Sequence, residues 1–97
     1  MAQVVYSARL LAQLERAFEL LRTSNTPVVE RAVRAIVSAI ENLANHPLIG
    51  RRIDGEIREL IISFGETGFL ALYEFVVPRD EVRVLAIARQ RELGYLP

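Results

Sequence analysis

The spacing of apolar residues changes once along this chain, and that change constrains the fold more than any other feature of the sequence. Between residues 10 and 43, apolar residues recur every three or four positions, which is the spacing of amphipathic helices. Between residues 56 and 89 they form short runs rich in β-branched and aromatic residues, separated by turn residues. Helices in the first half and strands in the second half predict an α+β domain.

The first half is expected to form one strand and two helices. Gln3–Tyr6 is predicted to be a strand, and Ser7 suits the N-cap of the helix that follows. The polar segment 23–27 ends that helix, and Pro27 suits the first turn of a second helix, which ends before Pro47. Because the link is short, we expect an antiparallel hairpin. The expected inward stripes are Leu10, Leu11, Leu14, Ala17, Phe18 and Leu21, then Val29, Val33, Ile36, Ile40 and Leu43.

The second half is expected to form an antiparallel meander. A polar, glycine-marked connector at 48–55 precedes three predicted strands, at 56–63, 69–77 and 81–89. The turns between these strands are short, as a meander requires. The order β-α-α-β-β-β predicts a single domain over residues 1–97, with a largely antiparallel sheet and the helical hairpin packed on one face.

Charge and composition exclude several classes of function. Twelve arginines and no lysine balance twelve acidic residues, so the net charge is zero and any phosphate site must be a local arginine cluster. Cysteine is absent and there is one histidine, His46, which argues against disulfides, zinc and a catalytic triad. We expect no metal and no cofactor. The sequence shows neither a signal-peptide pattern nor a membrane-length apolar run, and it suits the cytoplasm.

Five segments together resemble one family in their order and spacing. They are Tyr6-Ser7, Pro47–Arg51 (as P-x-x-G-R), Ile57–Leu60 (I-R-E-L), Leu72–Glu74 (L-Y-R) and Ala86–Tyr95 (A-I-R-H-Q-R-E-A-G-Y). The chain resembles the RelE/ParE superfamily of bacterial toxins from type II toxin–antitoxin systems, and it is most similar to the ParE-like branch. One departure matters: Ala88 stands where that branch has Arg, and the arginine is displaced to position 89. In a strand, that displacement moves the side chain to the opposite face.

The resemblance implies a toxin that inhibits DNA gyrase, blocks replication and is neutralised by a cognate antitoxin. The residues it implies for binding the target are Arg89, Arg91 and Tyr95, followed by Arg51, Arg52 and Arg58. The alternative is a ribosome-dependent endoribonuclease of messenger RNA that uses Arg58, Arg89 and Tyr95. A second alternative, suggested by Ala88, is a toxin fold that has lost its activity.

Ordinary structural roles compete with these assignments. Arg58 and Arg83 lie in predicted strands and can form cross-strand pairs with Glu59, Glu74 or Glu81. His46 suits a helix C-terminus, and Tyr73 suits the core. Both faces of the predicted sheet are substantially apolar, which predicts that a partner covers the face without helices. We expect an antitoxin segment to bind there, as helices in a groove or a strand on an edge, against Leu60, Ile62, Leu85 and Ile87.

Overall fold

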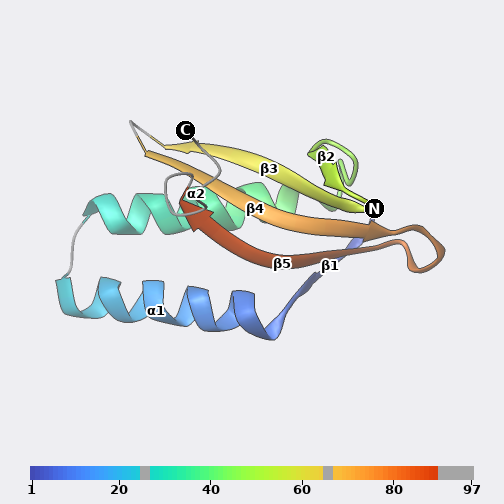
Figure 1. The fold of residues 1–97 in the computed structure, drawn as a ribbon. Helices are drawn as coiled ribbons and strands as arrows, with labels where there is room; N and C mark the ends of the chain where they lie inside the picture. The colour runs from blue at the N-terminus through green and yellow to red at the C-terminus, as the bar shows by residue number, and fades with distance from the viewer. Residues whose placement is uncertain (25–26, 65–66, 90–97) are drawn as a thin grey trace.

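The structure is a computed structural model that describes residues 1–24, 27–64 and 67–89. Along the chain (Figure 1) the elements are β1 (Gln3–Tyr6), α1 (Ala8–Ser24), α2 (Pro27–Asn42), β2 (Arg51–Asp54), β3 (Ile57–Phe64), β4 (Thr67–Val76), the 3-10 turn η1 (Val77–Arg79) and β5 (Glu81–Arg89). The predicted α+β class is confirmed, and β1 and β5 have the predicted bounds.

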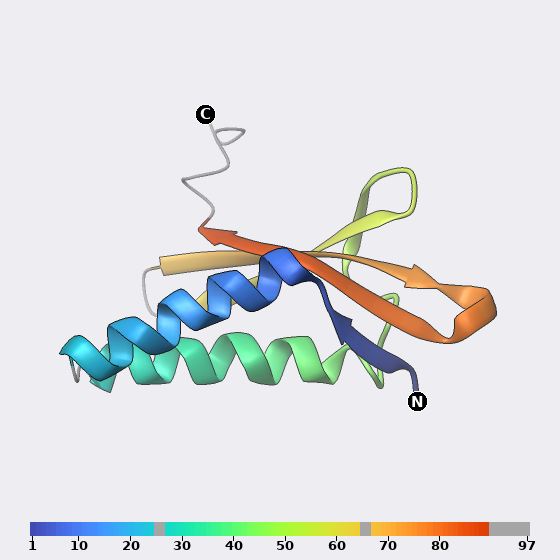
Figure 2. The same ribbon diagram turned by 90° about the horizontal axis from the view of Figure 1, so that it is seen from below.

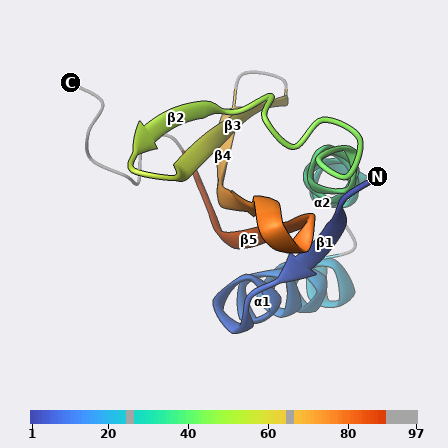
Figure 3. The ribbon, with the colours of Figure 1, turned by 90° about the vertical axis from the view of Figure 1, so that its right-hand side faces the viewer.

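The five strands form one sheet in the order β1-β5-β4-β3-β2. Neighbouring strands from β2 to β5 pair antiparallel, so the predicted meander is confirmed, whereas β1 pairs parallel with β5. β1 and β2 therefore lie at opposite edges of the sheet (Figure 3). The first and last strands become neighbours because the two helices separate β1 from the meander in sequence.

Both helices lie on the same side of the sheet (Figure 2). α1 contacts β5, α2 contacts β3, and the helices also contact each other. The buried cluster between these layers joins Leu10 and Leu14 of α1 to Ile36 and Ile40 of α2, and it includes Tyr73 at 0% exposure. We call the other side of the sheet the open face.

The caps of both helices follow the sequence. Ser7 Oγ accepts a hydrogen bond from the backbone N–H of Leu10 at 3.0 Å, which is the predicted N-cap contact. The same hydroxyl donates to the carbonyl of Leu85 at 2.7 Å and so ties the start of α1 to β5. α2 begins at Pro27, as expected from the fixed φ of proline.

The connector at 48–55 contains a strand that the sequence pattern does not predict. β2 pairs with β3 through a hairpin whose turn includes Gly55 at φ +56°. All four β2 residues are exposed, and three of them are charged. No alternation of buried and exposed positions therefore marks this strand, and only the glycine indicates a turn.

Three of the four residues predicted for the open face lie on the helical side. Ile62 is 5% exposed within the core cluster, and Leu60 and Ile87 pack against that cluster. In β3, Leu60-Ile61-Ile62 is uniformly apolar, so alternation gave the wrong phase. In β5, a bulge causes the error: Tyr73 pairs with Val84 and Leu72 with Ala86, so the register skips Leu85. Leu85, partly buried, is not among the side chains packed on the core.

The portion of β5 that extends beyond β1 is closed by a side chain of α1. β1 pairs with β5 only as far as Val84. Further along, Gln13 Nε2 donates to the carbonyl of Ile87 at 2.7 Å, and the N–H of Ile87 donates to Gln13 Oε1 at 2.8 Å. The amide side chain thus replaces a neighbouring strand at an edge that would otherwise be open to pairing with another chain.

Candidate functional site: an arginine hairpin

The β2–β3 hairpin brings together three of the predicted target-binding arginines. Its register places Arg51 opposite Glu59 and Arg52 opposite Arg58. Paired residues share a face of the sheet. Arg51 therefore projects on the open face with Glu59, and Arg52 projects on the other face with Arg58.

Glu59 is a buried carboxylate on the open face, with 4% exposure. Arg51 Nη2 donates to Glu59 Oε1, although the Arg51 side chain is itself 73% exposed. A buried carboxylate is costly without a hydrogen-bonded partner, so the pair fixes the start of β2 over β3. From the sequence, Glu59 was considered only as a partner of Arg58 or Arg83.

Arg58 holds the loop that precedes β2. Its Nη1 donates to the carbonyl of Gly50 at 2.7 Å and lies 3.3 Å from the carbonyl of Leu48. The expected pairing of Arg58 with a cross-strand carboxylate is therefore wrong for the ion pairs that the described residues form. Arg58 instead neutralises two carbonyl dipoles in the P-x-x-G-R segment, which places Arg51 and Arg52 at the mouth of the hairpin.

Tyr73 holds the same loop from the other side, and its predicted place in the core is confirmed. The N–H of Gly50 donates to the Tyr73 hydroxyl at 2.7 Å. Burial raises the pKa of Tyr73 above its ordinary value, although the Gly50 N–H and the charge of Arg58 act in the opposite direction. The hydroxyl therefore stays neutral and accepts this bond across the physiological pH range.

We expect Arg58→Met to lower the free energy of unfolding by about 2 kcal/mol, because the carbonyls of Gly50 and Leu48 lose a charged donor. Arg58→Lys should recover part of the loss, since one ammonium supplies the charge without the planar fork. Urea denaturation measures both changes. Arg52→Met is the matched control: Arg52 is 58% exposed and lies 3.8 Å from Glu56, so a change below about 0.5 kcal/mol is expected. Equal losses at both positions would contradict the assigned role of Arg58.

Arg83 lies on the open face between two carboxylates. Its Nε donates to Glu81 at 2.6 Å, and its Nη1 lies 4.0 Å from Glu74, the residue opposite it in β4. The pKa of Arg83 is raised above its ordinary value, mainly by the hydrogen bond and charge of Glu81. The predicted pairing of Arg83 with sheet carboxylates is thus confirmed, and this cation is already neutralised.

The remaining predicted residues do not join the hairpin. Arg89 is the last residue of β5 and pairs with Phe69, which packs against the core, so Arg89 projects on the helical side. Three strand spacings, about 14 Å, separate β5 from β2. Arg91 and Tyr95 lie outside the described residues. The structure therefore groups Arg51, Arg52 and Arg58 but does not bring Arg89 to them.

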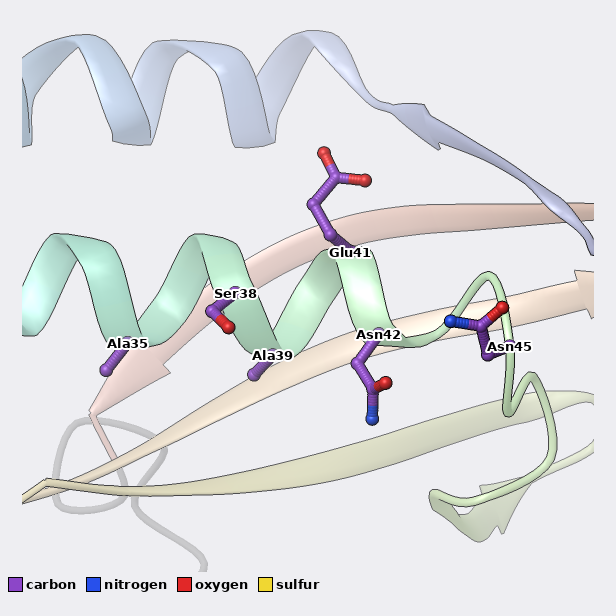
Figure 4. A pocket seen from close by; sticks show the side chains of 6 residues that line it. All are labelled: Ala35, Ser38, Ala39, Glu41, Asn42 and Asn45. Carbon is purple, nitrogen blue, oxygen red and sulfur yellow. The ribbon is translucent and has the colours of Figure 1, made fainter.

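Two hollows lie on the helical side, and none of the predicted site residues lines either of them. One, of about 520 Å³, runs along α2 and is lined by small and polar side chains, Ala35, Ser38, Ala39, Glu41, Asn42 and Asn45 (Figure 4). The other, of about 350 Å³, lies beside α1. His46 is exposed beyond the end of α2 and lines neither hollow.

Two general properties complete the description of the described residues. No cluster of three or more His, Cys, Asp or Glu side chains there is arranged to hold a metal ion. Within the same part of the chain, neither helix has the length and apolar character needed to cross a membrane.

The fold and the sequence agree on one family. The chain belongs to the family of ParE toxins of type II toxin–antitoxin systems (parDE), whose model matches residues 4–94. Toxin RelE3 of Caulobacter vibrioides is 43% identical over 44 residues, which are 45% of this chain and 48% of that toxin. The match thus spans about half the length of this curated relative.

Solved structures share the architecture. The chromosomal ParDE system of P. aeruginosa contains a chain with a TM-score of 0.66 and 18% identity, over 92% of this chain and 96% of that one. The intact RelBE toxin–antitoxin complex of E. coli contains a chain with a TM-score of 0.55 and 14% identity, over 91% of this chain and 95% of that one. At these identities the likeness establishes the fold.

Proposed function

We propose that this chain is the toxin of a type II toxin–antitoxin pair, that it inhibits DNA gyrase by binding, and that a cognate antitoxin neutralises it. The observation that carries the proposal is the match to the ParE toxin family over residues 4–94. The fold supports the same conclusion, since chains of this architecture occur in ParDE and RelBE complexes.

The charges on the open face favour binding of a protein over cleavage of RNA. A ribonuclease needs cations available to the scissile phosphate, together with a base and an acid of near-neutral pKa. Arg51 is paired with Glu59, and Arg83 is paired with Glu81 and Glu74. A phosphate would have to compete with these carboxylates for both cations. Interfaces with proteins tolerate such mixed charge and draw much of their affinity from a few Arg and Tyr side chains.

The residues proposed to contact gyrase are the exposed arginines Arg51, Arg52 and Arg89, together with Arg91 and Tyr95 of the C-terminal segment. Arg58 supports this set by holding the loop before β2. Arg51 and Arg52 lie at one edge of the sheet and Arg89 ends β5, so the proposed contact surface is broad.

The test is to express the chain in bacteria without an antitoxin and to follow incorporation of labelled thymidine and labelled methionine over the first minutes. DNA synthesis should fall first, and the purified chain should inhibit supercoiling by purified gyrase. A first fall in methionine incorporation would contradict the proposal and support messenger-RNA cleavage through Arg58, Arg89 and Tyr95. Normal growth with folded, abundant protein would indicate a toxin fold without activity.

Variants locate the contact surface. Arg51→Gln combined with Arg52→Gln, Arg89→Ala and Tyr95→Ala should each raise the concentration needed for half-inhibition of gyrase by about tenfold or more. Arg34→Gln is the matched control, because Arg34 lies on α2, is 78% exposed and pairs with Glu30 of the same helix. Full inhibition by all three variants would refute the assignment of this surface and leave the toxin assignment standing.

A further inference from the structure

The hollow beside α1 is an apolar groove of about 350 Å³ lined by Tyr6, Leu11, Leu14, Glu15 and Phe18. Leu14 is 6% exposed and also belongs to the core cluster, so it links the groove to the interior. Leu11 and Phe18 are 50% and 49% exposed. Both were expected to face inward, and for these two residues the prediction is wrong.

The geometry of α1 explains the difference. Leu10 and Leu14, four residues apart, point at the sheet and are buried. Leu11 and Phe18 are seven residues apart, so they form a second apolar row that the sheet does not cover. Two large apolar side chains within one groove are a feature of interaction sites more than of ordinary protein surface.

One end of the groove is rigid and acidic. The Tyr6 hydroxyl donates to Glu41 Oε1 at 2.7 Å, which fixes the tyrosine ring and holds the α2 carboxylate beside it. Burial and the neighbouring Glu41 raise the pKa of Tyr6 above its ordinary value, so the hydroxyl remains a donor. Glu15 lines the groove itself and is exposed. Two carboxylates, from Glu15 and Glu41, therefore flank an apolar floor.

These carboxylates disfavour a second copy of the chain as the occupant. A two-fold antiparallel pairing of α1 with its copy would place Leu11 of each copy against Phe18 of the other. The symmetry axis would then pass between positions 14 and 15 and bring the two Glu15 side chains together. Like charges at such a seam are destabilising. A different chain with a cation opposite Glu15 meets no such penalty.

We propose that this groove binds an amphipathic helix of the antitoxin, with apolar side chains seated between Leu11 and Phe18 and an Arg or Lys beside Glu15 and Glu41. The identity of the partner rests on the proposed function. This surface lies on the helical side of the molecule, whereas the sequence pattern predicted the open face as the antitoxin site. A helix suits the groove because apolar side chains three or four positions apart match the spacing along α1.

The test measures binding of the full chain to the antitoxin encoded beside it, by isothermal titration calorimetry. Leu11→Gln and Phe18→Gln should each weaken binding by about 30-fold, the size of an interface hot spot. Val28→Gln is the matched control: Val28 is also in a helix and 52% exposed, but lies outside the groove. It should change the affinity less than threefold, or about 0.6 kcal/mol. Circular dichroism confirms that each variant is folded.

Charge gives a second, independent readout. Glu15→Gln should weaken binding by about threefold to tenfold at low salt and by less at high salt, because the loss is electrostatic. Glu30→Gln, on α2 and outside the groove, should have no such effect. Unchanged affinity in both Leu11→Gln and Phe18→Gln would refute the groove.

Other outcomes separate this inference from the proposed function. If the unmodified chain failed to bind the antitoxin, both the neutralisation assigned under the proposed function and the groove's occupant would be refuted, while gyrase inhibition would still be tested by its own assay. A free chain that sediments as a dimer, and becomes a monomer in Leu11→Gln, would replace the antitoxin helix with a second copy.

Discussion

Gly50→Ala is expected to lower the free energy of unfolding by about 3 kcal/mol, the upper range for overpacking a buried site. A Cβ at position 50 would lie 2.6 Å from the Cε1 and hydroxyl of Tyr73 and 2.7 Å from the carbonyl oxygen of Glu59. The tyrosine is fully buried and the carbonyl is backbone, so neither can move away easily. The loop must instead shift and release the hydrogen bond from Gly50 to Tyr73.

Thermal denaturation measures the effect, and a fall in Tm of more than about 10 °C is expected for a domain of this size. Gly55→Ala is the control. Gly55 has φ +56° and no atom of the described residues within 4 Å of a built Cβ, so this variant carries only the backbone cost, about 1 kcal/mol. Tyr73→Phe should remove the hydroxyl contact and relieve part of the clash in the double variant. A Gly50→Ala variant as stable as Gly55→Ala would contradict the packing described for this loop.

The fold could largely be predicted because its strongest patterns are local. The alternating steps of four and three from Val29 to Leu43 define α2, and the valines before Ser7 define β1 and the N-cap. β5 is bounded by turn residues on one side and was predicted at its observed limits. β2 was missed because its pairing with β3 depends on charged side chains at exposed positions, which no hydrophobic pattern records.

The faces of the sheet could not be assigned from sequence for a different reason. Leu60, Ile61 and Ile62 are all apolar, so period-two alternation does not say which of them faces the helices. The bulge at Leu85 then reverses the alternation within β5. Both errors concern tertiary placement, which local patterns do not contain.

The candidate site was predicted in composition but not in detail. Arg51, Arg52 and Arg58 were chosen as a set from the resemblance, and the structure places them in one hairpin. Only the folded arrangement separates their roles, since Arg58 binds backbone carbonyls while the exposed Arg51 and Arg52 project on opposite faces. The buried Glu59 was underestimated because a charged residue in a strand ordinarily suggests an exposed position.

Gln13→Ala is expected to lower the free energy of unfolding by about 2 kcal/mol, because it removes two hydrogen bonds to the partly buried backbone of Ile87. Gln13→Glu should be at least as destabilising at pH 7. The introduced carboxylate still accepts the Ile87 N–H, but its second oxygen faces the Ile87 carbonyl, where the amide had donated. Val28→Ala, at an exposed helical position, controls for a general effect of truncating a side chain in a helix.

The Gln13→Glu variant adds a dependence on pH with a definite sign. The facing carbonyl of Ile87 disfavours the charged form, so the pKa of the introduced carboxyl in the folded variant should lie above that in the unfolded chain, which is about 4.3. A raised pKa in the folded state makes the variant more stable as the pH falls, because the protonated carboxyl can again donate to Ile87. The stability difference between Gln13→Glu and Gln13→Ala, measured by urea denaturation from pH 7 towards about 4.3, should therefore shift in favour of Gln13→Glu. A difference that does not change with pH would show that position 13 does not close the edge of β5 through the Ile87 carbonyl.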